Sequence, residues 1–291
     1  MKSLYLDHQY IARETAGQPA HWQQLSAMLA ANPEWRLAVS ECNLLEIASD
    51  GDKMRAQRRA AFVDSLKPAW MMERLDIQKC EVKAFLWKNH FHVEPVPFVV
   101  FHDHLSQVTI HHTRPIIGET ATSWVARIDP SEIDAAKRQT LSSLRTLQTA
   151  TKQQKKQIDE AVFRAWVELK IPPKDPGGRL VKKADREGLA GFCWTNRNQF
   201  YRECPAMGVE HFACVARTRD PNRQPTESDA IDLQHTVLGL SHCDALVTER
   251  YAHSTAAYAI KALAPLPLAT LHRKFGPDIL KTARLAPAGG H

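Results

Sequence analysis

The sequence predicts an α/β fold built around a central parallel sheet. Strand-like and helix-like segments alternate through the first 50 residues and again through the last 60, which is the pattern of parallel strands joined by helices. The chain has 291 residues, enough to bury a large core in one or two domains. Its 44% hydrophobic and 24% charged residues are typical of a soluble globular protein.

The N-terminal alternation begins with a short strand that ends in an acid. The run Ser3–Leu6 is strand-like, and Asp7 follows it directly. The next expected elements are a helix over 20–31, a strand over 36–40, a helix over 41–49 that carries Glu46, a turn at 50–52, a helix over 53–67 and a mixed apolar segment over 71–87.

The C-terminal alternation centres on the stretch from Ser228 to Glu249. It predicts a helix that begins with acids and leads into a buried strand over 245–247. Asp229 and Asp232 are three residues apart, so they share a face of that helix. The residues that flank the strand are Asp244 before it and Thr248 and Glu249 after it. Further elements are expected as a strand over 211–216, a helix over 256–263, a short strand over 277–280 and a tail over 286–291.

Histidines gather in the segment 88–128, which holds six of the chain's fourteen. Irregular structure is expected there, with short strands such as 98–101. The pairs His90/His92 and His102/His104 are each two residues apart, so on a strand each pair shares a face. That spacing permits a zinc site, but no acid or cysteine completes a ligand pattern. A polar surface region or a substrate-facing loop is the simpler interpretation.

A basic helical region is expected after Ser131, which is placed to cap a helix running to about Lys170. From Lys137 to Arg186 there are 13 Lys or Arg and 5 Asp or Glu. This excess fits either a solvated helix face or a phosphate-binding surface. Aromatic residues interleave with arginines farther on, at Phe192, Trp194, Phe200 and Tyr201, where a core helix is favoured over a base-stacking surface.

Composition narrows the partners and the compartment. The net charge of +6 and the pI near 9.0 favour an anionic partner, with nucleic acid the first candidate. The six cysteines are scattered without a C-x-x-C pair, so reduced and mostly buried thiols are expected. No apolar run reaches the roughly 18 residues of a membrane span, and the N-terminus lacks a signal-peptide pattern, so we expect no membrane partner and a cytoplasmic location.

Five acids fall near predicted strand ends or helix starts: Asp7, Glu46, Asp232, Asp244 and Glu249. In parallel sheets, sites form beyond the carboxyl ends of the strands. Crowded carboxylates repel each other unless a cation lies between them. Mg²⁺ and Mn²⁺ favour carboxylate oxygens, and such ions support phosphate hydrolysis without a histidine or cysteine nucleophile.

These motifs resemble those of the PIN-like domain nucleases. That family has an Asp at the end of the first strand, a Glu within a helix after a Ser/Thr-rich strand end, and an Asp that opens a later helix. LYLD, which ends at Asp7, matches the first, and VSECNLLEI, which contains Glu46, matches the second. Asp232 lies sixteen residues before Thr248 of ALVT and matches the third.

The family pattern has a fourth acid around a strand that ends in Thr, and here that acid stays open between Asp244 and Glu249. Asp229 is an alternative to Asp232 as the third. The resemblance covers about 110 residues at the two ends of the chain. It implies a three-layer PIN-like fold formed by residues 1–84 and 211–285. Residues 85–210 would be a large, mostly helical insertion that carries the histidine-rich segment and the basic helices.

The resemblance further implies a metal-dependent endonuclease, with RNA the favoured substrate. Asp7, Glu46, Asp232 and Asp244 would be catalytic and would hold Mg²⁺ or Mn²⁺, with Glu249 as a further ligand. Two alternatives stay open: a non-catalytic module that binds RNA or a protein partner or inhibitor in a toxin or defence system, and a DNA nuclease of the flap-processing type. The simplest competing interpretation is an unrelated α/β domain whose acids are helix caps and surface residues.

Overall fold

A computed structural model describes residues 1–16, 19–108, 120–128, 160–218 and 224–281, together with a few single residues between 138 and 149. Its centre is a six-stranded sheet with the strand order β4-β3-β2-β1-β5-β6. The strands are β1 (Lys2–Leu6), β2 (Trp35–Val39), β3 (Ala69–Met71), β4 (Phe101–His102), β5 (Ala245–Val247) and β6 (Thr270–His272).

The sheet is parallel apart from its β4 edge, which pairs with β3 in the antiparallel direction. From β1 the chain moves outward through β2 and β3, and it later returns to the other side of β1 as β5 and β6. The gap between β1 and β5 is therefore the point where the direction of winding reverses. In open α/β sheets, ligands bind outside the carboxyl ends of the strands at such a point.

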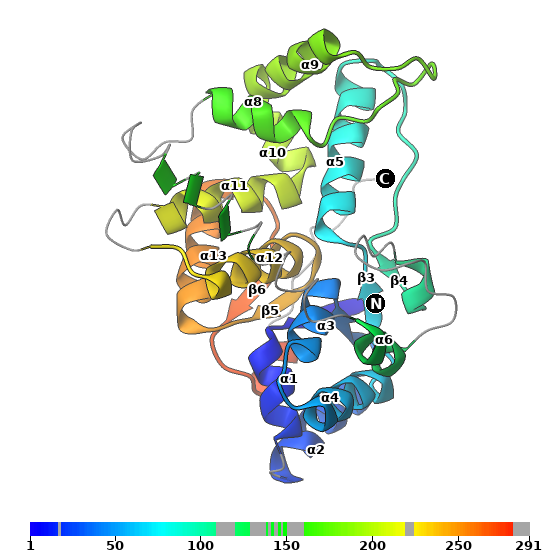
Figure 1. The fold of residues 1–291 in the computed structure, drawn as a ribbon, viewed down its shortest axis with the longest axis vertical. Coiled ribbons are helices and arrows are strands. Elements are labelled where there is room, and N and C mark those ends of the chain that lie inside the picture. Colours follow the sequence, from blue (N-terminus) through cyan, green and yellow to red (C-terminus); the bar gives the residue numbers. More distant parts are fainter. Residues whose placement is uncertain are drawn as a thin grey trace.

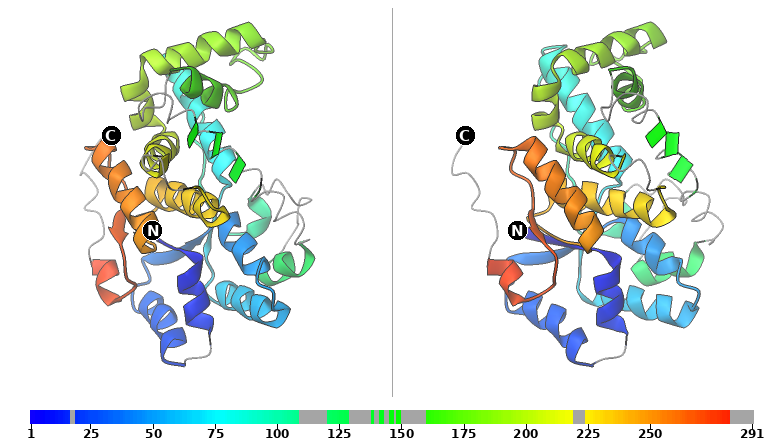
Figure 2. Two further views of the ribbon diagram at one scale, coloured as in Figure 1. Left: turned by 60° about the vertical axis from the view of Figure 1, so that its left-hand side comes forward. Right: turned by 90° about the vertical axis from the view of Figure 1, so that its left-hand side faces the viewer.

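Side chains of the central strands alternate between two buried layers, as the two-residue period of a strand requires. On β1, Leu4 and Leu6 belong to one cluster and Tyr5 to the other. On β5, Ala245 and Val247 lie on the first side and Leu246 on the second. A sheet buried on both faces needs a helical layer on each side, and Figure 2 shows helices on both sides of the strands.

Helices from the N-terminal half supply the first layer, with an apolar core against Leu4, Leu6 and Val39. They are α1 (His8–Thr15), α2 (Pro19–Ala30), α3 (Glu41–Ala48), α4 (Lys53–Ser65) and α6 (Ala121–Arg127). The other layer and its extension contain α5 (Arg74–Asn89), α8 (Glu160–Glu168), α9 (Lys183–Thr195), α10 (Arg197–Glu203), α11 (Pro205–Thr218), α12 (Glu227–His242) and α13 (Arg250–Leu263). Two short 3₁₀ helices, η1 (Leu105–Gln107) and η2 (Pro277–Lys281), complete the described elements.

The second layer extends away from the sheet along α5, so that α8 and α9 lie at one end of the long axis and α2 at the other (Figure 1). Aromatic rings hold this extension together. Phe163 of α8 and Phe200 of α10 are fully buried, with ring centroids 5.6 Å apart, and Phe85 of α5 meets Phe200 at 5.1 Å. The aromatic residues of this region therefore form core helices, as favoured above, and Phe200 and Tyr201 are not available to stack bases.

The predicted α/β class is confirmed, and so are the first two strands, the strand over 245–247 and the helices near 20–31, 41–49, 53–67 and 256–263. The predicted strand over 211–216 is wrong, because this run lies within α11. Ala206, Val209 and Ala213 recur at helical spacing and are fully buried. The Glu81 carboxylate accepts hydrogen bonds from the Ala206 and Met207 amides at the start of this helix.

The predicted strand over 277–280 is also wrong, since these residues form η2. The last strand is β6, which pairs with β5 and has only three half-buried residues, too few to produce an alternating pattern. The strand expected over 98–101 lies slightly later, at β4. The segment over 71–87 divides into the end of β3 and most of α5.

The expected domain limits at 84/85 and 210/211 fall inside α5 and α11, so no break in secondary structure marks either one. Much of the basic region, including 131–137 and 151–159, lies outside the described residues, as do His111, His112 and the tail over 286–291. The six cysteines are free, and all except the half-buried Cys80 are buried. Among the described helices, none combines the length and apolar character needed to cross a lipid bilayer.

Candidate metal centre

The candidate site lies at the carboxyl ends of β1 and β5, on either side of the winding reversal. Asp7 follows β1 and is only 5% exposed. Its amide donates to the Val247 carbonyl at 3.0 Å, and the Thr248 hydroxyl donates to Asp7 Oδ2 at 3.1 Å. These bonds between the two strand ends fix the Asp7 carboxylate at the edge of the sheet. Asp7 also caps α1, with Oδ1 accepting a 3.4 Å bond from the Gln9 amide.

Glu46 reaches this edge because α3 begins directly after β2. Ser40 is the N-cap of α3, and its amide donates to Asn43 Oδ1 at 3.0 Å. Asn43 Nδ2 donates to the Leu6 carbonyl at 3.1 Å, so the first turn of α3 is attached to the end of β1. Glu46 comes three residues later on the same face of the helix and therefore points toward the β1 edge.

His235 enters from α12 and is the residue that sequence reasoning missed. It is fully buried, and its Nε2 atom lies 2.5 Å from Glu46 Oε2. Its Nδ1 atom lies 2.7 Å from the Tyr5 hydroxyl. Gly239, one turn later, lets α12 lie this close to the sheet, because an added Cβ would come within 2.7 Å of Leu246 Cδ1 and 3.0 Å of Tyr5 Cδ1.

Opposite charges dominate the electrostatics of His235. Burial by itself lowers its pKa, but the carboxylates of Glu46, Asp7 and Asp232 raise the pKa of His235 to about 9. The imidazolium and the Glu46 carboxylate therefore form a buried ion pair at neutral pH. Removing either partner of such a pair leaves an uncompensated charge at the site.

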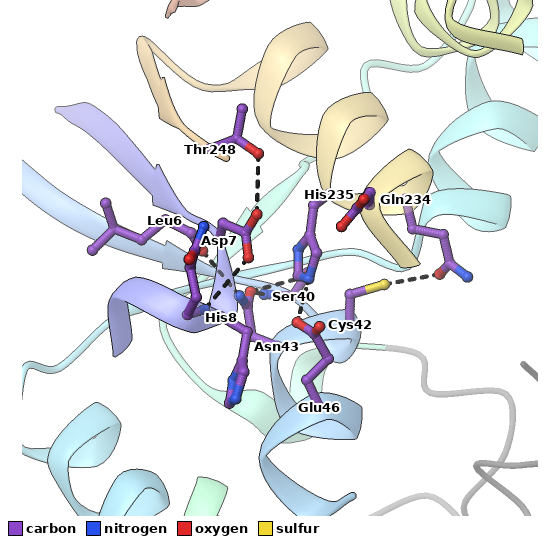
Figure 3. Close-up of polar contacts among 12 residues, drawn as sticks. Leu6, Asp7, His8, Ser40, Cys42, Asn43, Glu46, Gln234, His235 and Thr248 are labelled. Carbon is purple, nitrogen blue, oxygen red and sulfur yellow. Dashed lines mark hydrogen bonds and ion pairs between the residues drawn. The ribbon is translucent and has the colours of Figure 1, made fainter. Parts of the chain in front are cut away.

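Asp7, Glu46 and His235 converge on one point (Figure 3). One ligand atom from each lies within 4.8 Å of the other two, although the residues come from three distant segments of the chain. Two carboxylates and one imidazole are a donor set that suits a divalent cation. Within the described part of the chain, this is the one group of three or more acids, histidines or cysteines close enough to share an ion. The histidine-rich segment contains no such group among its described residues.

A cavity of about 360 Å³ opens beside these residues. Its lining includes His8, Glu46, Asp50, Arg59, Glu227 and Asp232. Arg59 donates to Asp50 Oδ2 at 2.5 Å, and its Nη1 atom lies 3.4 Å from His8 Nε2. The Arg55 hydrogen bond is the largest cause that lowers the pKa of Asp50 to about 2, and the Asp52 amide and the Arg59 charge lower it further. The cavity lining thus contains one positively charged side chain, Arg59, among several acids.

Asp232 lies on this cavity rather than among the three converging ligand atoms. Its side chain is 27% exposed, and Oδ2 lies 3.7 Å from Arg217 Nη2. Burial raises the pKa of Asp232 to about 6 against the opposing charge of Arg217, and the charges of Asp7 and Glu46 raise it further. Asp232 is therefore close enough to sense the site, and its role as a direct ligand stays a prediction.

Asp229 does not replace Asp232 at the site, because its carboxylate is paired with Arg217 and engaged in the N-terminal cap of its own helix. Oδ1 accepts from Arg217 at 3.0 Å, and Oδ2 accepts from the Thr226 amide at 2.8 Å and the Thr226 hydroxyl at 3.0 Å. These contacts form the capping box of α12. The alternative of Asp229 as third acid is therefore not supported by the geometry.

The prediction that Asp244 belongs to the site is wrong. Asp244 precedes β5 and accepts bonds from the Ser3 amide at 2.8 Å and the Ser3 hydroxyl at 3.1 Å. Ser3 and Asp7 are separated by four residues of β1, or about 13 Å at roughly 3.3 Å per residue. Because β1 and β5 are parallel, Asp244 lies at the opposite edge of the sheet from Asp7.

Glu249 lies at the correct edge, directly after Thr248 and at the N-cap of α13. Its side chain is exposed. Partial desolvation and then the charges of Asp7 and Glu46 raise the pKa of Glu249 above its ordinary value. Of the two candidates for the fourth acid, the geometry therefore favours Glu249.

A sequence signal for His235 did exist, although it was weak. His235 follows Asp232 by three residues, so the two share a face of the expected helix. The same is true of Asn43 and Glu46 on α3. What the spacing did not reveal is that Tyr5, on the inner face of β1, provides a buried partner for this histidine.

Comparisons with protein-family models, with curated proteins and with solved structures find no match to this chain. The function of the chain is therefore inferred from the geometry and chemistry of the site.

Proposed function

We propose that this protein is a metal-dependent endonuclease of the PIN-like type that hydrolyses phosphodiester bonds, with RNA the favoured substrate. The observation that carries the proposal is the convergence of Asp7 and Glu46 with His235 at the carboxyl edge of the sheet. These residues come from β1, α3 and α12, and the winding reversal between β1 and β5 is where α/β folds place their ligands.

The donor set fits the cation that the proposal requires. Asp7 is buried beside Glu46, and the nearby Asp232 and Glu249 add negative charge. Asp7 and Glu46 would hold the ion beside His235. When bound there, Mg²⁺ or Mn²⁺ supplies a Lewis acid that activates water and neutralises charge on a phosphate.

The protein's own residues would orient the reactants. Thr248 and the Val247 carbonyl fix Asp7, and Asn43 fixes the start of the helix that carries Glu46. The adjoining cavity, with Arg59 and His8 on its wall, provides room beside the acids for a phosphodiester and one neighbouring sugar. The net charge of +6 favours a polyanion over a neutral substrate.

The test compares cleavage of matched single-stranded RNA and DNA oligonucleotides in Mn²⁺ or Mg²⁺ by the full chain and by D7N and E46Q. We expect RNA to be cut by the unaltered protein and neither oligonucleotide by the variants, provided that circular dichroism shows them folded. Equal cleavage by folded D7N would refute this site. Preferential cleavage of branched DNA would instead identify the flap-processing alternative.

A second candidate is a non-catalytic module that binds RNA or a protein partner. The observation that favours it is the ion pair of His235 with Glu46, which neutralises one site carboxylate from within the protein. Calorimetric titration with Mn²⁺ separates the two functions, because the module needs no affinity for metal at Asp7.

A further inference from the structure

His235 stands at the end of a buried chain of hydrogen bonds whose directions can be worked out. The chain runs from the Leu6 carbonyl through Asn43, Ser40 and Tyr5 to His235. Ser40, Asn43, Tyr5 and His235 are each no more than 1% exposed. With so little access to solvent, these groups must satisfy one another, so each bond restricts the direction of the next.

The chain starts with a fixed amide. Asn43 accepts at Oδ1 from the Ser40 amide at 3.0 Å and donates from Nδ2 to the Leu6 carbonyl at 3.1 Å. The reversed amide would place a donor against a donor and an acceptor against an acceptor, so only one orientation is possible. The Ser40 hydroxyl lies 3.2 Å from Asn43 Oδ1, which has only lone pairs, and must therefore donate to it.

Ser40 consequently accepts a hydrogen bond from Tyr5. The two hydroxyl oxygens lie 2.6 Å apart, and with the Ser40 hydrogen used on Asn43, the bond must run from Tyr5 to Ser40. The Tyr5 oxygen then has only a lone pair to offer His235 Nδ1, at 2.7 Å. His235 must carry its hydrogen on Nδ1, and Nε2 becomes the atom aimed at Glu46 Oε2 and Asp7.

We propose that His235 Nε2 is a ligand of the cation held by Asp7 and Glu46, so that the centre binds a first-row transition cation such as Mn²⁺ in preference to Mg²⁺. This inference rests on the proposed function in one respect, namely that Asp7 and Glu46 hold a divalent ion. It adds the identity of a nitrogen ligand and the class of metal that follows from it.

The physical reason is that a metal-binding histidine must present one nitrogen lone pair while its other nitrogen donates to a fixed acceptor. Tyr5 is that acceptor. Binding of the cation would displace the proton from Nε2, and the Nδ1 hydrogen bond to Tyr5 would be kept. Imidazole suits transition cations, whereas Mg²⁺ favours oxygen ligands and retains its waters, so a nitrogen donor shifts selectivity away from Mg²⁺.

The direct test is pulsed electron paramagnetic resonance of the full chain with one equivalent of Mn²⁺. We expect electron spin-echo modulation from a bound ¹⁴N nucleus, replaced by ¹⁵N modulation when the protein is prepared with ¹⁵N-histidine. This measurement needs no variant, so it does not depend on whether a substituted protein folds.

Three variants assign the nitrogen. H235N keeps a side-chain donor near the Tyr5 hydroxyl but lacks Nε2, so the nitrogen signal should vanish and Mn²⁺ affinity should fall about 100-fold, with a smaller loss for Mg²⁺. Y5F keeps the ligand but removes its fixed acceptor, so the signal should stay and Mn²⁺ affinity should fall about 10-fold. H8N tests the other histidine near Asp7, and the nitrogen signal should stay in this variant.

The outcomes separate this inference from the proposed function. If Mn²⁺ binds to the unaltered protein but not to D7N, and no histidine nitrogen is detected, the ligand assignment is overturned while the carboxylate centre stands. A nitrogen signal that survives in H235N also overturns the assignment. If no Mn²⁺ binds at all, both proposals fail.

Discussion

Acids lie at both the carboxyl ends and the amino ends of the parallel strands, but the contacts that they make at the two ends differ. Asp7 and Glu249 follow β1 and β5 at the carboxyl edge, whereas Asp244 precedes β5 at the amino edge. Asp244 accepts two bonds from Ser3 that join the strand starts. Glu46 instead meets the imidazole of His235, and Asp7 keeps oxygens close to both of them.

Buried acids elsewhere in the protein also differ in their contacts. Asp229 is fully engaged by Arg217 and Thr226, and Glu41 has an oxygen, Oε1, that lies buried without a hydrogen-bond partner. An acid is therefore part of the site only when its carboxylate converges with other ligand atoms, as that of Asp7 does with Glu46 and His235. Position beside a strand or helix end does not distinguish these cases.

Replacing Asp7 should have a much larger effect on cleavage than replacing Asp244. D7N should lower Mn²⁺-dependent cleavage by about 100-fold or more, because it removes a buried charge from the proposed cation site. Cleavage rates with saturating oligonucleotide measure this. D244N is the matched control at the other edge and should retain the rate of the unaltered protein. A comparable loss in both variants would contradict the division of roles.

A second set of variants tests whether the contacts of Asp229 stabilise the fold. Arg217→Met should lower the free energy of unfolding by about 3 kcal/mol, because Asp229 would keep a buried charge without its partner. Urea unfolding followed by circular dichroism provides the measurement. The double variant Arg217→Met/Asp229→Asn should recover part of that loss, and absence of any recovery would show that the pair is not coupled.

The pH dependence of the free energy of unfolding should distinguish Glu41, whose Oε1 atom has no hydrogen-bond partner, from the other buried acids. Burial first, and then the charges of Glu73 and Asp76, raise the pKa of Glu41 to about 8, from an ordinary value of 4.5. A raised carboxyl pKa contributes stability that is full below pH 4.5 and is lost as the pH rises through 8. E41Q should therefore match the unaltered protein near pH 4.5 and exceed it by about 5 kcal/mol above pH 8.

Thermal or urea unfolding of both proteins between pH 4.5 and 9 checks this. E41D is a suitable control, since it keeps an ionisable group at the position. A difference between E41Q and the unaltered protein that is independent of pH would mean that Glu41 does not titrate in this range.

The smallest change in stability is expected for D244N, at the amino ends of the strands. D244N should lower the free energy of unfolding by about 1 kcal/mol, because an amide oxygen accepts more weakly from Ser3 than a carboxylate does. Chemical unfolding with metal absent and then present provides the measurement. The decrease should be the same in both conditions, and a decrease that depends on metal would return Asp244 to the site.

Much of the fold could be predicted from short-range patterns. The runs that became β1, β2 and β5 are apolar and end in polar residues, and α3 and α4 begin at Ser40 and Asp52, which are ordinary caps. α11 could not be separated from a strand by its apolar run over 211–216 alone. The decision depended on Pro205 and on Glu81, which comes from a helix 125 positions earlier in the chain.

Part of the site was predictable for the same reason. Asp7 and Glu46 were identified because strand ends and helix starts can be located in sequence. His235 was not identified, because its importance comes from Tyr5 and Glu46, which are 230 and 189 positions away. Asp244 was wrongly included because the sequence places it near the strand without showing which edge of the sheet collects the other acids.

By itself, the sequence determined the alternation of strands and helices, the basic charge and the presence of acids at the ends of β1 and α12. These are properties of neighbouring residues, controlled by period, capping and composition. Only the tertiary structure decided which acids meet, because the order of parallel strands and the close approach of α12 at Gly239 depend on packing between distant segments. The same packing placed His235 between Tyr5 and Glu46, with its Nδ1 atom toward Tyr5 and its Nε2 atom toward the site.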